Sequence, residues 1–321
     1  MCLIFVCLRS LGIPESKELL GSLFPEEQSK GKEPEHILQI CVDSKIGPLG
    51  TRALASALLG RGSGMKSHYP FIKSLRFWEA ETGDAGVAAV AAVLKTGGPL
   101  VALTNVEFMN CEVTPDGCWA LADALMMGAN TSLLSLQLDI NPSLGDAGAL
   151  QLCEGLRSNS SLTKLQLSYC EVGADGAAAL AEVLSMPTCA LKSLDVSGNR
   201  LGSEGMLSLV SGLASNTKLE ELNLADNNIG ATLDSSASED AMAALGDALV
   251  SPTCPLAVVD LTLNSIEAAA AELLVQYLGS DNTKVRGFLV DASLPPDLYD
   301  KLLRVDKGKK KKKKGKGKKK K

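Results

Sequence analysis

The sequence has few residues of the kinds that carry catalysis. Aromatic residues make up 4% of the 321 positions, and the two histidines, His36 and His68, fall in expected linkers. The chain contains no HExxH, no GxSxG and no cysteine–histidine spacing typical of a zinc site. Acidic residues are numerous, but carboxylates on protein surfaces are more often solvated than catalytic. We therefore expect no enzymatic activity, no metal site and no cofactor.

Cysteine is present without a recognisable pattern. Nine cysteines are scattered along the chain with no CxxC pair, and their number is odd. Such a set favours free thiols in a reducing compartment over a disulfide framework. We therefore expect a cytoplasmic protein, in which the sequons at Asn130 and Asn159 are not glycosylated.

Long apolar runs are also missing. No stretch of 18 apolar residues occurs, so no membrane-spanning helix is expected. The first residues, MCLIFVCL, are apolar but too few, and neither a basic segment before them nor a small-residue cleavage site after them indicates a signal peptide. We interpret this run as packing against the core. The alternatives are a signal peptide and an anchor through acylated Cys2 or Cys7.

The charge is divided unevenly along the chain. The net charge is −5, but residues 307–321 hold 12 lysines and no acid. The remaining residues hold 20 basic and 37 acidic side chains, a net charge of −17. An acidic body with a basic tail predicts two different kinds of contact.

One pattern of apolar residues repeats through most of the chain. The run 191–213, LKSLDVSGNRLGSEGMLSLVSGL, alternates apolar and polar residues around Leu194 and then spaces Leu209 and Leu213 by four. Alternation indicates a short strand, the spacing of four indicates a helix, and Asn199 marks the bend between them. Similar runs start at residues 72, 103, 133, 162, 219 and 256, at steps of 28 to 31 residues and one step of 37.

These runs resemble the leucine-rich repeat, L-x-x-L-x-L-x-x-N/C-x-L, in its long ribonuclease-inhibitor-like subtype. The alternation of Cys111 and Cys170 with asparagine at the bend agrees with that subtype. The resemblance implies an α/β solenoid shaped like a horseshoe, with parallel strands on the concave face and helices on the convex face. We expect a non-repeating segment at 1–36, the repeats and a C-terminal cap helix at 37–306, and a disordered Lys-rich tail at 307–321.

Two local segments interrupt the repeats. The longest step carries about eight extra residues around 231–240, which we interpret as a surface loop, with Ser236 and Glu239 as a capping box for the following helix. A phosphorylatable acidic loop is the alternative. The glycine-rich run 60–67 fails the phosphate-loop pattern because Met65 separates Gly64 from Lys66, so we expect an ordinary loop there.

The repeat pattern also predicts which strand residues point away from the core. The first set, here called the inner row, is Arg76, Glu107, Gln137, Gln166, Asp195, Asn223 and Asp260. The next set, here called the end row, is Trp78, Met109, Asp139, Ser168, Ser197, Ala225 and Thr262. Beside them lie Glu79, Ile140, Tyr169, Asp226 and Leu263. Aromatic residues are common binding anchors and acids attract a basic partner, so we expect the main partner site here. The alternative is a partner on the helices or loops.

The predicted function is that of a non-enzymatic scaffold for protein–protein interaction. The basic tail predicts an acidic partner, such as tubulin tails, nucleic acid or anionic lipid, or the acidic body of the same chain. The lysines concerned are Lys309, Lys310, Lys311, Lys312, Lys313, Lys314, Lys318, Lys319, Lys320 and Lys321. The alternative function is regulation of a small GTPase, because Ran GTPase-activating proteins share this repeat subtype. A third interpretation, part of an innate-immune receptor, would need a nucleotide-binding domain before the repeats. The resemblance to scaffolds of cilia and flagella predicts the cytoplasm, with the cytoskeleton or cilium as a finer location and the nucleus as the alternative.

Overall fold

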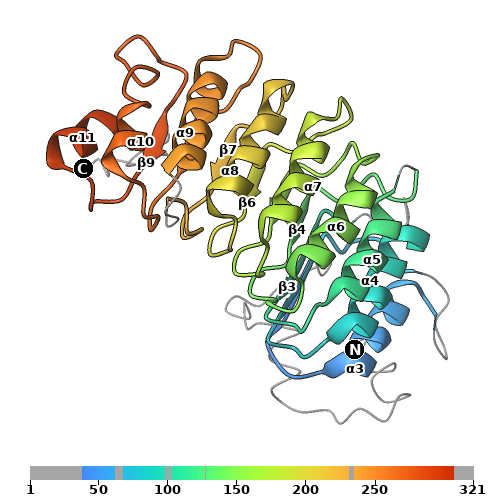
Figure 1. Cartoon of the computed structure of the whole chain (residues 1–321). Helices are drawn as coiled ribbons and strands as arrows, with labels where there is room; N and C mark the ends of the chain where they lie inside the picture. The colour runs from blue at the N-terminus through green and yellow to red at the C-terminus, as the bar shows by residue number, and fades with distance from the viewer. Residues whose placement is uncertain are drawn as a thin grey trace, which may run out of the picture.

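The computed structural model describes residues 38–61, 68–97, 101, 103–126, 128–230 and 235–306. The predicted segment 1–36 and the tail 307–321 lie outside these ranges. Strands and helices alternate along the described chain (Figure 1). The strands are β1 (Gln39–Val42), β2 (Ser74–Trp78), β3 (Asn105–Met109), β4 (Ser135–Gln137), β5 (Lys164–Gln166), β6 (Ser193–Asp195), β7 (Glu221–Asn223), β8 (Val258–Asp260) and β9 (Gly287–Leu289). The helices are α3 (Gly47–Leu58), α4 (Gly83–Gly97), α5 (Pro115–Leu125), α6 (Gly145–Leu156), α7 (Ala174–Ser185), α8 (Gly202–Ser211), the 3-10 helix η2 (Gly212–Ala214), α9 (Ser235–Val250), α10 (Ala268–Glu272) and α11 (Pro296–Leu302).

The described strands form one parallel sheet in sequence order, from β1 to β9. The helices lie side by side along one side of this sheet (Figure 1). Neighbouring strands lie about 4.8 Å apart, whereas packed helices need about 8–10 Å. The stack therefore curves with the sheet on its inner side, and the predicted α/β solenoid is confirmed.

The core lies between the sheet and the helices. The repeated leucines fill it; Leu165 and Leu167 of one repeat, for example, are fully buried. Phe77 and Phe108 from neighbouring repeats stack with their ring centroids 5.0 Å apart. One repeat could not bury these side chains alone, so each repeat depends on its neighbours.

Buried asparagines connect successive repeats at the bends. The Oδ1 atom of Asn199 accepts hydrogen bonds from the backbone N–H groups of Cys170 and Val172, both at 3.0 Å. Its Nδ2 group donates to the carbonyl oxygens of Leu167 and Val196, both at 2.8 Å. Asn141 and Asn264 make equivalent bonds in their own pairs of repeats. These bonds explain why asparagine recurs at the bend of the repeat.

The insertion after β7 differs from the prediction. Helix α9 begins at Ser235, so Ser236 and Glu239 lie inside the helix and the predicted capping box is wrong. Ser238 and Ala241, in the first turns of this helix, are buried. The residues of this insertion that remain outside the described ranges are 231–234.

The C-terminal end of the solenoid is closed by α11 and the residues that follow it. Leu298 and Leu302 are buried, as expected for the predicted cap helix. Arg304 pairs with Phe288 of β9 through two antiparallel backbone hydrogen bonds of 2.8 Å. Its guanidinium also donates to the carbonyl oxygens of Gly279, Asn282 and Val285. The last described residues therefore run along the edge of the sheet, where the Lys-rich tail begins.

Candidate functional site

The inner row forms one continuous line across the sheet. The register pairs each of its residues with the next, starting with Arg76 and Glu107 and ending with Asn223 and Asp260. All seven side chains are half-buried. Residues far apart in the sequence, including Gln137 and Gln166, therefore belong to one surface.

Three side chains at the N-terminal end of this surface hold one another in place. The Nε atom of Arg76 lies 2.6 Å from a carboxylate oxygen of Glu107. The guanidinium of Arg76 lies 4.8 Å from the ring centroid of Trp78, and the indole N–H donates to Glu107 at 3.3 Å. These contacts hold Trp78 in place, and its side chain is half-buried. Met109, which lies beside Trp78 in the register of β2 and β3, is also half-buried.

Asp139 departs from the prediction of an exposed acid. Its side chain is buried, with one oxygen accepting from Gln137 Nε2 at 2.6 Å and the other from the Ser168 backbone N–H at 2.8 Å. Desolvation by burial raises the pKa of this carboxyl above its usual value, more than these hydrogen bonds lower it. Asp139 therefore organises the neighbouring strands and presents little surface to a partner.

Asp195 is the centre of a polar network in the middle of the sheet. Its Oδ1 atom accepts from the hydroxyls of Ser168 at 3.0 Å and Ser197 at 2.7 Å. Its Oδ2 atom accepts from Asn223 Nδ2 at 3.0 Å. The network fixes the carboxylate of Asp195 while leaving it half-buried at the surface.

A third line of residues, here called the turn row, follows the strand ends. It consists of Glu79, Asn110, Ile140, Tyr169, Gly198, Asp226 and Leu263, and all seven have a positive φ between 50° and 67°. Left-handed backbone is unusual for bulky or β-branched residues and costs about 1–3 kcal/mol at such positions, whereas glycine, as at Gly198, adopts it freely. The hydrogen bonds between repeats enforce it: the N–H of Ile140 donates to Ser168 O, and that of Tyr169 to Ser197 O.

This backbone conformation exposes apolar side chains beside the polar network. Tyr169 is 51% exposed, Ile140 43% and Leu263 65%. Ile140 and Tyr169 belong to neighbouring repeats and are adjacent in the turn row. They provide apolar surface next to the acids of the inner row.

Four aspartates in the C-terminal half of the concave face have no cationic neighbour among the described residues. Among the described residues, no lysine or arginine lies within 4.0 Å of a carboxylate oxygen of these four. The four, here called the acidic quartet, are Asp195, Asp226, Asp260 and Asp291. Some acids elsewhere are paired, for example Glu171 with Arg200 at 2.5 Å and Glu220 with Lys192 at 3.4 Å, so the quartet is distinguished by its position along one face of the sheet.

Asp291 is the member of the quartet that the sequence analysis missed. The register of β8 and β9, extended by two residues, places it beside Thr262 of the end row. Its carboxylate accepts backbone hydrogen bonds from Ser293 and Leu263, which lower its pKa. The sequence carries a signal for it, because Val285, Phe288 and Val290 follow the apolar spacing of the earlier strands and predict one last strand just before Asp291.

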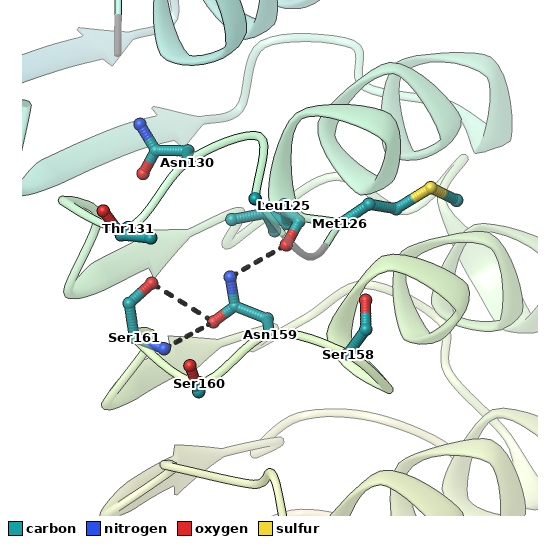
Figure 2. A pocket seen from close by; sticks show the side chains of 9 residues that line it. Leu125, Met126, Asn130, Thr131, Ser158, Asn159, Ser160 and Ser161 are labelled. Atoms are coloured by element: carbon teal, nitrogen blue, oxygen red, sulfur yellow. Dashed lines mark hydrogen bonds between the residues drawn. The ribbon is translucent and has the colours of Figure 1, made fainter. Parts of the chain in front are cut away.

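A shallow hollow of about 110 Å³ lies at the C-terminal end of α5, between the loops that lead into β4 and β5. Figure 2 shows Asn159 Nδ2 donating to the carbonyl oxygen of Leu125 at 2.9 Å, while Asn159 Oδ1 accepts from Ser161. Asn130 uses its amide in the same way one repeat earlier. Both asparagines are buried, so this hollow is a structural junction, and neither sequon presents its amide for glycosylation.

Three further observations concern the described part of the chain alone. Its seven cysteines are free thiols, and six of them are buried. It contains no group of three or more His, Cys, Asp or Glu side chains arranged to hold a metal ion. None of its helices is both long and apolar enough to cross a membrane. The predicted polyanion-binding lysines of the tail lie outside the described residues.

Known proteins with similar sequences carry the same repeat. The family model described as a leucine-rich repeat matches residues 158–181, 189–210 and 215–232. A ribonuclease inhibitor from Sus scrofa is 39% identical over 173 residues, covering 53% of this chain and 36% of the relative. The NACHT, LRR and PYD domains-containing protein 12 of Mus musculus is 33% identical over 238 residues, covering 73% of this chain and 21% of the relative.

The chain is a leucine-rich repeat protein of the ribonuclease-inhibitor-like type. It spans 36% and 21% of the length of the two relatives described above. The C-terminal domain of a Caenorhabditis elegans tropomodulin matches with a TM-score of 0.40 and 17% identity, over 51% of this chain and 90% of that domain.

Proposed function

We propose that the chain is a non-catalytic scaffold that binds a protein partner on its concave sheet. Its membership of the leucine-rich repeat family supports protein binding as the class of function. The pig relative is named as an inhibitor of ribonuclease, so that relative has a protein ligand by name. Solenoids of this kind present an extended concave surface suited to such a ligand.

The observation that carries the proposal is the juxtaposition of exposed apolar residues and unpaired acids. Ile140 and Tyr169 project from the turn row, and Asp195 and Asp226 lie on the neighbouring repeats. An aromatic ring gives a large, rigid contact area, and it is a frequent centre of binding energy in interfaces. Carboxylates without cationic neighbours favour a partner with a basic surface.

We also propose the cytoplasm as the compartment. The buried free thiols fit a reducing environment, since an oxidising one favours disulfides. Non-reducing mass analysis of the chain recovered from cells tests this proposal, and a disulfide-linked form would contradict it.

The experiment for the binding face is affinity purification with two matched double variants. The concave variant, Tyr169→Ala/Asp226→Asn, removes one exposed aromatic ring and one unpaired charge without introducing a new side chain into the core. The convex control, Trp119→Ala/Glu272→Gln, makes the same two changes on α5 and α10, where Trp119 is 61% exposed. We expect partners captured by the intact chain to be lost from the concave variant and kept by the control. Loss from the control alone would place binding on the helices.

A further inference from the structure

The acidic quartet forms a strip that leads from the C-terminal edge of the sheet toward its centre. Its members come from four successive repeats, β6 to β9, and the described residues supply no cation to any of them. Three of the carboxylates are held by neighbouring N–H and hydroxyl groups: Asp195 by Ser197, Asp260 by Thr262, and Asp291 by Ser293. These bonds fix the acids in place and leave their negative charge without a counter-charge.

The Lys-rich tail begins at the same edge of the sheet. The backbone of Arg304 pairs with Phe288 of β9, and Arg286 lies 3.4 Å from Asp306. A Cβ atom built on Gly287, the first residue of β9, would lie 3.5 Å from the Cβ of Asp306. Asp306, the last residue that the structure describes, therefore lies beside the start of β9, whereas Asp291 follows the C-terminal end of that strand.

The tail is long enough to follow the whole strip. Residues 307–321 number 15, and an extended chain spans up to about 3.3–3.6 Å per residue, or about 50 Å in all. Three strand spacings of about 4.8 Å separate β9 from β6, which amounts to about 14 Å. The tail must also run back along the strand direction from the level of Arg286 to that of Asp291, a further distance of about 17 Å. The tail can thus reach Asp195 and continue to Tyr169 with length to spare.

We propose that residues 307–321 bind the acidic quartet of their own chain and compete there with the protein partner. The tail carries 12 lysines and no acid, and the rest of the chain has a net charge of −17. Attachment at the edge of the sheet holds the lysines at an effective concentration of about the millimolar range, so even weak contacts are occupied. The competition rests on the proposed function, whereas binding of the tail does not.

A synthetic peptide of residues 307–321 with a fluorescent label tests the binding without any partner. We expect fluorescence anisotropy to show binding to the chain that ends at Asp306 at low salt, and about tenfold weaker binding to the intact chain, whose own tail occupies the strip. Higher salt should weaken binding, because exposed charges are screened within about 10 Å at 0.1 M. Equal affinity for the intact and shortened chains would overturn the proposal.

Two triple variants of the shortened chain locate the bound peptide. Asp195→Asn/Asp226→Asn/Asp260→Asn removes three charges of the quartet, and we expect about tenfold weaker binding from three pairs worth up to about 1 kcal/mol each. Asp123→Asn/Glu154→Gln/Glu182→Gln removes three charges from the helices α5, α6 and α7, and we expect no comparable change. Equal weakening by both variants would show only a general attraction to an acidic body and would overturn the assignment to the quartet.

The state of the intact chain distinguishes its own tail from the tail of a second copy. We expect sedimentation at low salt to give a monomer at every concentration. Dimers that form as concentration rises, and disappear when the tail is removed, would contradict an intramolecular contact. If the peptide binds as expected but the partner of the intact chain is unaffected by Tyr169→Ala/Asp226→Asn, the proposed partner site fails while the tail contact stands.

Discussion

The ring of Tyr169 lies across Gly198, so closely that a Cβ atom at Gly198 would come within 2.4 Å of the tyrosine Cδ1 atom. The exposed ring therefore owes its position to the missing side chain in the next repeat. Gly198→Ala should force the ring to move and should also strain the backbone, since φ at Gly198 is 67°.

Gly202→Ala separates the two effects of that substitution. Gly202 has a similar φ of 62°, but nothing lies within 4 Å of a Cβ atom built there. Both variants should lose about 1 kcal/mol of stability from the left-handed backbone. Only Gly198→Ala should shift the NMR signals of the Tyr169 ring, and identical ring signals in the two variants would contradict the contact.

The asparagine ladder predicts a large loss of stability from one small substitution. Asn199→Ala leaves the N–H groups of Cys170 and Val172 and two carbonyl oxygens without their partner. Each unsatisfied buried group costs about 1–3 kcal/mol, so we expect a loss of about 3 kcal/mol or more in urea unfolding. Asn105→Ala is the control. The Oδ1 atom of Asn105 accepts a hydrogen bond from the hydroxyl of Thr104, the preceding residue, so we expect a loss of stability below about 1 kcal/mol.

The buried thiols predict a selective pattern of alkylation. Burial raises the pKa of Cys153 and of Cys170 to about 12, so almost no reactive thiolate forms at a pH of about 8. Cys41 is half-buried and more accessible. Among these three, we expect iodoacetamide to modify Cys41 first in the folded chain and all three equally after unfolding. Peptide mapping by mass spectrometry checks the order, and rapid modification of Cys170 would contradict the burial.

Asp139 and Asp291 predict pH dependences of opposite sign. Burial raises the pKa of Asp139, so the folded chain binds its proton more tightly, and its contribution to stability falls as the pH rises from about 4 through the raised pKa. Hydrogen bonds from the backbone N–H groups of Ser293 and Leu263 lower the pKa of Asp291, so its contribution is lost as the pH falls through that lowered value.

Urea unfolding of Asp139→Asn and Asp291→Asn over this pH range measures both effects. The stability of the unchanged chain relative to Asp139→Asn should decrease with rising pH, and that relative to Asp291→Asn should increase. Curves that run parallel in the two comparisons would contradict the environments described for these carboxyls.

The repeat period, together with the resemblance to leucine-rich repeats, predicted the sheet, its register and the alignment of the inner row. This succeeded because the leucines that fix the register recur at constant spacing, so one correct repeat aligns all the others. The buried asparagines were predictable for the same reason: Asn199 and Asn264 stand at one position of the pattern. The binding roles of the inner-row residues stay predictions until a partner is measured.

The environment of individual side chains was not predictable in this way. Asp139 occupies the same row as Trp78 and Met109, and it is buried because Gln137 and Ser168 enclose it. The positive φ of Ile140 and Tyr169 depends on hydrogen bonds to the next repeat, and β-branched or aromatic residues give no local signal for it. The start of α9 at Ser235 was likewise not predictable, because Ser236 and Glu239 match a capping pattern that the helix does not use.

The affinity of a purified partner for the two double variants tests the concave face most directly. With a partner captured as described, we predict that Tyr169→Ala/Asp226→Asn raises the Kd about tenfold or more, because it removes an interface anchor and a steering charge. Trp119→Ala/Glu272→Gln should leave the Kd within about twofold. An unchanged Kd for the concave variant, with a weakened convex control, would contradict binding on the sheet.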